Sequence, residues 1–215
     1  MKYLLLLLCF SALGQADFEK NLQKRLILAE DGSTIEIEAG RFQLTKSLSL
    51  EGKKNITLRG KGIDQTILSF KGQTQGAEGI KVSNCENIVI EDMTTEDSKG
   101  DLIKTMQVKG ITFRRLKAAW TGGPKSTNGS YALYPVLCEN VLIDSCIAIG
   151  ASDAGIYVGQ SKNIIVRNSE AYQNVAGIEI ENSLYADVYN NKAIGNTGGI
   201  LVFDLPDLVQ KKGGH

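Results

Sequence analysis

The sequence predicts an all-β fold, a right-handed parallel β-helix solenoid with an N-terminal capping helix. A short motif returns every 22 residues, as Gly155-Ile156-Tyr157-Val158, Gly177-Ile178-Glu179-Ile180 and Gly199-Ile200-Leu201-Val202. A second short apolar strand follows the first two motifs, and no helical pattern separates the strands. A unit of this size cannot bury its own apolar face, so successive coils must stack on one another.

Residues 1–16 have the pattern of a signal peptide. Met1-Lys2 precedes an apolar run over residues 4–10, and Gly14-Gln15-Ala16 supplies small residues for cleavage. The apolar run is shorter than the ~20 residues that span a bilayer. We therefore expect no membrane span and a secreted or periplasmic protein.

An amphipathic helix is expected over residues 17–31. Phe18, Leu22, Leu26 and Ala29 are spaced by four, four and three positions, which places them on one helical face. This helix would cover the first coil, whose strand edges would otherwise be unpaired. The repeats then occupy residues 32–215. No capping segment follows the last repeat, so we expect a C-terminal truncation; the alternative is another cover for the last coil.

The coils can be aligned on one apolar residue of the second strand. In order these residues are Ile37, Leu58, Ile90, Phe113, Ile143, Val166 and Val188. Longer steps between some of them indicate insertions, one of which directly follows Trp120. Asparagines recur near the strand ends, where their side chains tolerate left-handed backbone and bond neighbouring backbone.

Composition excludes several kinds of site. The 24 basic and 24 acidic residues give zero formal net charge without a long run of either sign, so no nucleic-acid surface is expected. His215 is the only histidine, which argues against a histidine-based triad and a zinc site. Cys85, Cys138 and Cys146 do not form a disulfide framework and are expected to be buried.

The repeats carry a family resemblance. Residues 31–42 and the segment Asn55-Ile56-Thr57-Leu58-Arg59-Gly60 resemble the opening of pectin-lyase-like β-helix proteins. Residues 151–161 and 199–206 resemble exported bacterial parallel β-helix repeat-containing proteins, a family without an established function. The resemblance covers nearly the whole chain after residue 16. It implies that the first parallel sheet forms a long cleft of the kind that holds a polysaccharide.

Strand alternation places one column of side chains on the outside of that sheet. The column contains Lys81, Lys104, Tyr134, Tyr157, Glu179 and Leu201. Tyrosine rings can stack on sugars and lysines can meet uronate carboxylates, so the first five are candidate substrate-binding residues. Trp120 is a further candidate because its insertion could form a wall of the cleft. The alternative is that these are ordinary solvated positions.

Asp153, Glu181 and Asp204 form a candidate metal site close to Glu179. Carboxylates of this kind hold Ca²⁺, the one cofactor that the sequence suggests. The alternative for Asp153 and Asp204 is a role in turns. No catalytic residue can be named, because the motifs of polygalacturonases and alginate epimerases are missing.

We therefore expect an exported protein that binds a polysaccharide. Catalysis stays open, as a lyase, hydrolase or epimerase. The alternative is a non-catalytic scaffold that docks another exported protein.

Overall fold

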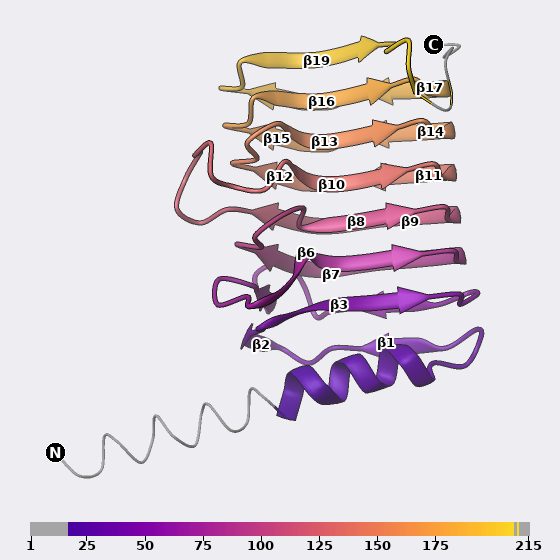
Figure 1. Ribbon diagram of the computed structural model, residues 1–215, viewed down its shortest axis with the longest axis vertical. Coiled ribbons are helices and arrows are strands. Elements are labelled where there is room, and N and C mark those ends of the chain that lie inside the picture. The colour runs from indigo at the N-terminus through magenta and orange to yellow at the C-terminus, as the bar shows by residue number, and fades with distance from the viewer. Residues whose placement is uncertain (1–16, 209, 211–215) are drawn as a thin grey trace, which may run out of the picture.

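The described part of the chain forms a stack of seven coils, each of which contributes a strand to three faces (Figure 1). The computed structural model describes residues 17–208 and 210. All strand pairings among these residues join one coil to the next and are parallel, as in β1 with β4 and β16 with β19. The expected parallel β-helix is confirmed. The signal-peptide prediction concerns residues 1–16, which lie outside the described residues.

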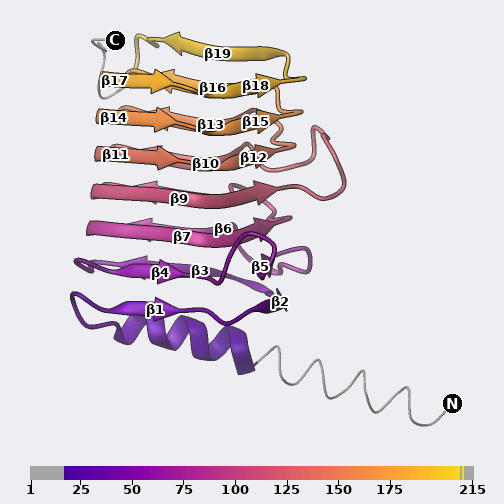
Figure 2. The ribbon, with the colours of Figure 1, turned by 180° about the vertical axis from the view of Figure 1, so that it is seen from behind.

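Faces 1 and 2 belong to one hydrogen-bonded sheet of twelve strands, and face 3 is a separate seven-stranded sheet (Figure 2). Face 1 contains β1 (Thr34–Glu36), β4 (Thr57–Arg59), β7 (Glu86–Glu96), β9 (Lys109–Ala119), β11 (Glu139–Asp144), β14 (Lys162–Arg167) and β17 (Leu184–Tyr189). Face 2 contains β2 (Gly40–Gln43), β5 (Thr66–Ser69), the second halves of β7 and β9, β12 (Ile147–Ile149), β15 (Glu170–Tyr172) and β18 (Lys192–Ile194). Face 3 contains β3 (Lys46–Glu51), β6 (Gln75–Ser83), β8 (Ile103–Met106), β10 (Tyr131–Val136), β13 (Ala154–Gly159), β16 (Ala176–Glu181) and β19 (Gly198–Phe203).

The coil alignment from sequence is correct except in the first coil. Leu58, Ile90 and Phe113 are paired in successive strands, as are the equivalent residues of the later coils. The partner of Leu58 is Ile35, and the predicted Ile37 lies beyond the end of β1. Ile37 is nevertheless completely buried. Apolar character therefore identified the interior but not the register of this coil.

The N-terminal helix spans residues 17–28 and covers the first coil (Figure 1). Leu22 and Leu26 are buried in the main core, and the rings of Phe18 and Phe42 stack with centroids 3.6 Å apart. This is the apolar face that the sequence predicts. Because the helix replaces a preceding coil, it seals the end of the interior from water.

Polar side chains of the same helix bond the free edge of the first coil. The Gln23 amide accepts a hydrogen bond from Ser49 N at 2.8 Å and donates one to Ser49 O at 3.0 Å. Glu19 accepts a hydrogen bond from the backbone N–H of Thr45. These contacts satisfy groups that an exposed strand edge would offer to another chain.

The asparagines have the two structural roles expected of them. Asn163, Asn168, Asn182 and Asn190 have φ values between 44° and 56°, in the left-handed region. Asn174 and Asn196 instead accept hydrogen bonds from the backbone of the preceding coil. Asn174 Oδ1 accepts from Ala151 N at 2.8 Å, and Asn196 Oδ1 accepts from Asn174 N at 2.9 Å.

Alternating charges run along the outside of face 1. In register, the column is Glu36, Arg59, Glu91, Arg114, Asp144, Arg167 and Tyr189. Arg59 Nε lies 2.7 Å from Glu91 Oε1, and Arg167 Nη2 lies 2.9 Å from Asp144 Oδ2. Opposite charges on adjacent strands favour this register over a shifted one.

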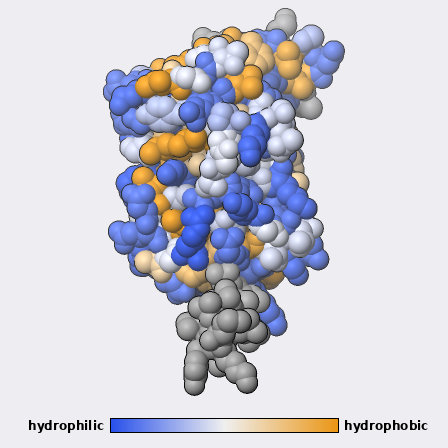
Figure 3. Space-filling view, turned by 90° about the vertical axis from the view of Figure 1, so that its left-hand side faces the viewer, coloured by the Kyte–Doolittle hydropathy of each residue, from blue (hydrophilic) through white to orange (hydrophobic). Residues whose placement is uncertain are grey.

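Burial differs between the middle of the stack and its last coil. Cys85, Cys138 and Cys146 are buried and free, as predicted. In the last coil, the inward positions Ile200 and Val202 are about half exposed, and apolar side chains gather at this end (upper part of Figure 3). The described residues include no helix that is long and apolar enough to cross a membrane.

Leu22→Ala should lower the free energy of unfolding by about 2–5 kcal/mol, because it leaves a cavity under the helix. Leu28 lies on the same helix but is 64% exposed, so Leu28→Ala should change the stability by no more than about 0.5 kcal/mol. Urea denaturation of both variants measures the difference. Equal effects would show that the helix does not seal the core.

Candidate functional site

The candidate binding column lies on the outer face of face 3, as predicted. Lys81 pairs with Lys104 and Lys104 with Tyr134, while Tyr157 pairs with Glu179. The strand pairing of β10 with β13 places Tyr134 beside Tyr157. A second outward column carries Glu181 beside Gly159. The five outward candidates and Glu181 therefore share one surface.

Three tyrosine rings form the centre of this surface. The centroids of Tyr131 and Tyr134 are 4.5 Å apart, those of Tyr131 and Tyr157 are 4.4 Å apart, and Tyr134 meets Tyr157 edge-on at 4.9 Å. Ala154 and Ala176 pack against them in a small apolar cluster outside the main core. We call Tyr131, Tyr134 and Tyr157 the tyrosine cluster. Aromatic clusters of this kind supply binding surfaces that are apolar but carry polar hydroxyls.

Sequence reasoning missed Tyr131, because strict alternation places it on the inward side with Leu133. The equivalent stretch of the next coil shows why alternation fails. A Cβ on Gly155 would lie 3.1 Å from the buried Ala148 Cβ, so Gly155 points inward beside the inward Ile156. Because Gly155 and Ile156 both point inward, the residue before them, Ala154, points outward. Tyr131, which pairs with Ala154, occupies that outward position.

Carboxylates surround the tyrosine cluster. Burial raises the pKa of Tyr131. The carboxylate of Asp153 raises this pKa further through its negative charge and by accepting a hydrogen bond from the Tyr131 hydroxyl. Burial also raises the pKa of Tyr157, followed by its hydrogen bond to Glu181. Both hydroxyls therefore stay protonated at neutral pH and act as donors to these carboxylates.

Glu179 is the carboxyl group with the most altered acidity. It is 7% exposed, and its burial, then the charges of Asp153 and Glu181, raise its pKa to about 7. A carboxyl group with this pKa exists in both protonation states near neutral pH. It can therefore donate or accept a proton under those conditions.

Lys104 is held beside the tyrosine cluster. Its Nζ lies 3.8 Å from Asp101 Oδ2 and 4.7 Å from the centre of the Tyr134 ring. Asp101 also accepts a hydrogen bond from Tyr131 N at 3.2 Å. The ammonium group of Lys104 is thus shared between a carboxylate and an aromatic face, whereas Lys81 lies one coil further away.

Trp120 does not line the surface, in contrast to its predicted place. The ring is buried in the main core, and its Nε1–H donates to Ser98 O at 3.0 Å. The following insertion is fixed by Asn128, whose amide donates to Gly150 O at 2.6 Å. A tryptophan beside a polar loop can face the solvent or lie in the core. Here the large apolar area of the Trp120 ring favours the core.

The candidate metal residues do not form one group. Asp153 and Glu181 border the tyrosine cluster on face 3, whereas Asp204 is exposed beyond the end of β19. Residues 17–208 and 210 contain no group of three or more His, Cys, Asp or Glu side chains that could hold a metal ion. Calcium binding therefore rests on the sequence pattern alone.

Solved structures resemble this fold at low sequence identity. The A-module of the mannuronan C-5 epimerase AlgE4 from Azotobacter vinelandii is 16% identical with a TM-score of 0.64, over 87% of this chain and 55% of that one. The catalytic domain of Agl-KA is 14% identical with a TM-score of 0.54, over 94% and 42% of the two chains. ORF18 of Geobacillus virus E2 is 13% identical with a TM-score of 0.51, over 85% and 54%. The chain thus spans about half the length of these proteins or less, and the likeness shows the fold alone.

Family membership comes from the sequence comparison. No curated protein matches the chain, but the family model described as right handed beta helix region matches residues 55–207. This range covers more than half of the chain and includes six of the seven strands of face 3. The chain therefore belongs to the right-handed β-helix family.

Proposed function

We propose that this protein is exported and binds a polysaccharide along the outer surface of face 3. The observation that carries the proposal is the tyrosine cluster with the carboxyl groups of Asp153, Glu179 and Glu181 around it. A sugar ring has apolar C–H faces and hydroxyl groups at its rim. Aromatic rings next to carboxylates match both features.

The parallel sheet extends these contacts in one direction. Equivalent residues repeat every ~4.8 Å along the stack, which suits a long, regular ligand better than a compact one. The AlgE4 A-module, which shares the fold, is named for an activity on the polysaccharide mannuronan. These two points support a polymer as the ligand.

The charges favour a neutral polymer over a uronate polymer. Asp101, Asp153, Glu179 and Glu181 surround the tyrosine cluster, and Lys104 is already paired with Asp101. A uronate carboxylate at the cluster would meet this negative charge. The sequence-based idea that Lys81 and Lys104 bind uronates therefore applies only to the coils before the cluster.

Processing of the bound polymer would use Glu179. Its carboxyl group can exchange a proton near neutral pH, which is what a hydrolase, lyase or epimerase requires. The surface does not select among these three reactions. A binding protein and an enzyme are distinguished by turnover of the bound polymer.

Tyr134→Leu should weaken binding to the preferred polymer about tenfold, which corresponds to about 1.4 kcal/mol. Leucine keeps the apolar packing but removes the flat ring. Binding is measured on a panel of neutral, uronate and amino-sugar polysaccharides, with and without Ca²⁺. Tyr172→Leu on face 2 is the matched control and should bind like the wild type. If the folded wild-type protein binds no polysaccharide, the scaffold alternative becomes the better description.

Glu179→Gln should change the pH dependence of stability. The folded-state pKa of about 7 exceeds the ordinary value of 4.5, so the contribution of Glu179 is complete below about pH 4.5 and lost as the pH rises through 7. The variant should therefore match the wild type near pH 4 and exceed it by about 1–3 kcal/mol at pH 8. Urea denaturation across this range measures the difference.

Glu170→Gln is the control for this experiment. The hydrogen bond from Lys192, then that from Tyr172, lowers the pKa of Glu170. Its contribution is present above the ordinary carboxyl pKa and lost as the pH falls, so the control should lose stability at neutral pH. A stability difference for Glu179→Gln that does not vary with pH would contradict the proposed environment of Glu179.

A further inference from the structure

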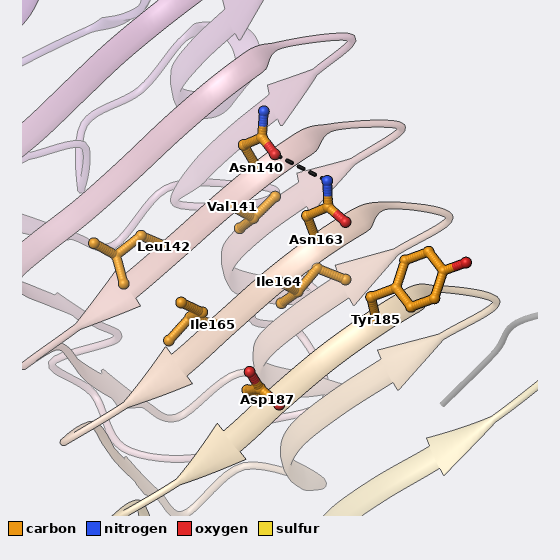
Figure 4. Close-up of a pocket in the computed structure, with 8 residues that line it drawn as sticks. All are labelled: Asn140, Val141, Leu142, Asn163, Ile164, Ile165, Tyr185 and Asp187. Atoms are coloured by element: carbon orange, nitrogen blue, oxygen red, sulfur yellow. Dashed lines mark hydrogen bonds between the residues drawn. The ribbon is translucent and has the colours of Figure 1, made fainter.

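Face 1 has a hollow of about 410 Å³ on its outer surface, lined by residues of β11, β14 and β17 (Figure 4). Its lining consists of Asn140, Val141, Leu142, Asn163, Ile164, Ile165, Tyr185 and Asp187. The volume is within the range of small-molecule sites. Faces 1 and 3 are different sides of the solenoid, so this hollow is separate from the tyrosine cluster.

Tyr185 has an unusual backbone conformation for its residue type. The equivalent positions of the preceding coils are Asn55, Asn87, Gly110, Asn140 and Asn163, all with positive φ. Tyr185 has φ 58°, although a bulky side chain makes this conformation costly. The residue is 67% exposed, so burial does not compensate for the strain. Strain without a packing gain is a reason to look for a function of the ring.

The tyrosine at position 185 also ends a ladder of side-chain amides on the preceding coils. Asn163 Nδ2 donates to Asn140 Oδ1 at 3.0 Å, and Asn87 Nδ2 donates to Asn55 Oδ1 in the same way. Tyr185 has no amide with which to continue the ladder. Figure 4 shows the carbonyl oxygen of Asn163 on the side away from Asn140, next to the Tyr185 ring. An acceptor is thus presented to the hollow.

The floor of the hollow is apolar and its far side is acidic. Leu142, Ile165 and Asp187 occupy one outward column in successive strands. Leu142 and Ile165 are half-buried, whereas Asp187 is exposed. The hollow therefore combines an apolar platform, a projecting aromatic ring and two kinds of oxygen acceptor.

We propose that this hollow is a second carbohydrate site, which binds a pyranose ring of a neutral polysaccharide. The C–H face of the sugar would lie on Leu142 and Ile165 and against the Tyr185 ring. Its hydroxyl groups would donate to Asn163 Oδ1 and to the Asp187 carboxylate. Because both polar groups accept and one is negatively charged, an anionic sugar is disfavoured.

Tyr185→Asn is the decisive variant, because it removes the ring and restores the residue type of the preceding coils. In the Tyr134→Leu background, which weakens the site on face 3, calorimetric titration with cellohexaose and mannohexaose should show affinity about tenfold lower once Tyr185→Asn is added, or about 1.4 kcal/mol. The melting temperature should stay the same or rise, since the strain is relieved. A structural role of Tyr185 predicts a lower melting temperature instead.

Tyr189→Asn is the matched control on the same strand. Tyr189 is also exposed, accepts a hydrogen bond from Arg167 and does not line the hollow. It should bind both hexasaccharides like the wild type. A mannuronate hexasaccharide, the anionic comparator, should bind more weakly than the neutral probes at this site.

The Tyr134→Leu background separates this site from the one on face 3. Binding that persists in Tyr134→Leu and is lost on adding Tyr185→Asn supports the second site, whatever happens on face 3. The inference is overturned if, in the Tyr134→Leu background, Tyr185→Asn binds the neutral probes like Tyr189→Asn, or if the melting temperature of Tyr185→Asn falls. It is also overturned if the wild type binds neither neutral probe, or if the mannuronate hexasaccharide binds equally well in the Tyr134→Leu background.

Discussion

The parallel register between coils is the constraint on which the whole structure depends. Each strand bonds to its equivalent one coil later, so a residue's column is fixed by the coil it belongs to. Asparagines with positive φ recur at the strand ends of successive coils, although two coils carry longer loops. A slip of one residue would turn every outward side chain inward. The tyrosine cluster and its carboxylates exist as a site because this slip does not occur.

Much of this arrangement could be predicted from the 22-residue period. Once Gly155, Gly177 and Gly199 are aligned, alternation places Tyr157 and Glu179 in one outward column, and the structure agrees. Alternation fails where Gly155 and Ile156 both point inward, and for that reason Tyr131 was missed. The first coil was misaligned by two residues because Ile35 and Ile37 are both buried isoleucines, so apolar character does not tell which of them pairs with Leu58.

Other features depend on the third dimension. The sequence cannot tell whether Trp120 faces the solvent, since that depends on a carbonyl of Ser98 in the preceding coil. The acidity of Glu179 arises from burial and from two carboxylates, Asp153 just before β13 and Glu181 at the end of β16. The strain at Tyr185 is likewise invisible until its backbone is compared with that of the asparagines before it. Periodicity thus predicts columns, while burial and acidity need the assembled stack.

The alternating charges on face 1 repeat every two coils, whereas the strands of the solenoid repeat every coil. Acidic and basic residues alternate from Glu36 through Arg59 and Glu91 to Arg167, so the charge pattern repeats only after two coils. Duplication or loss of one coil would set like charges on adjacent strands, which is unfavourable. Changes by two coils would preserve every pair. The length of this solenoid can therefore evolve most easily in even steps.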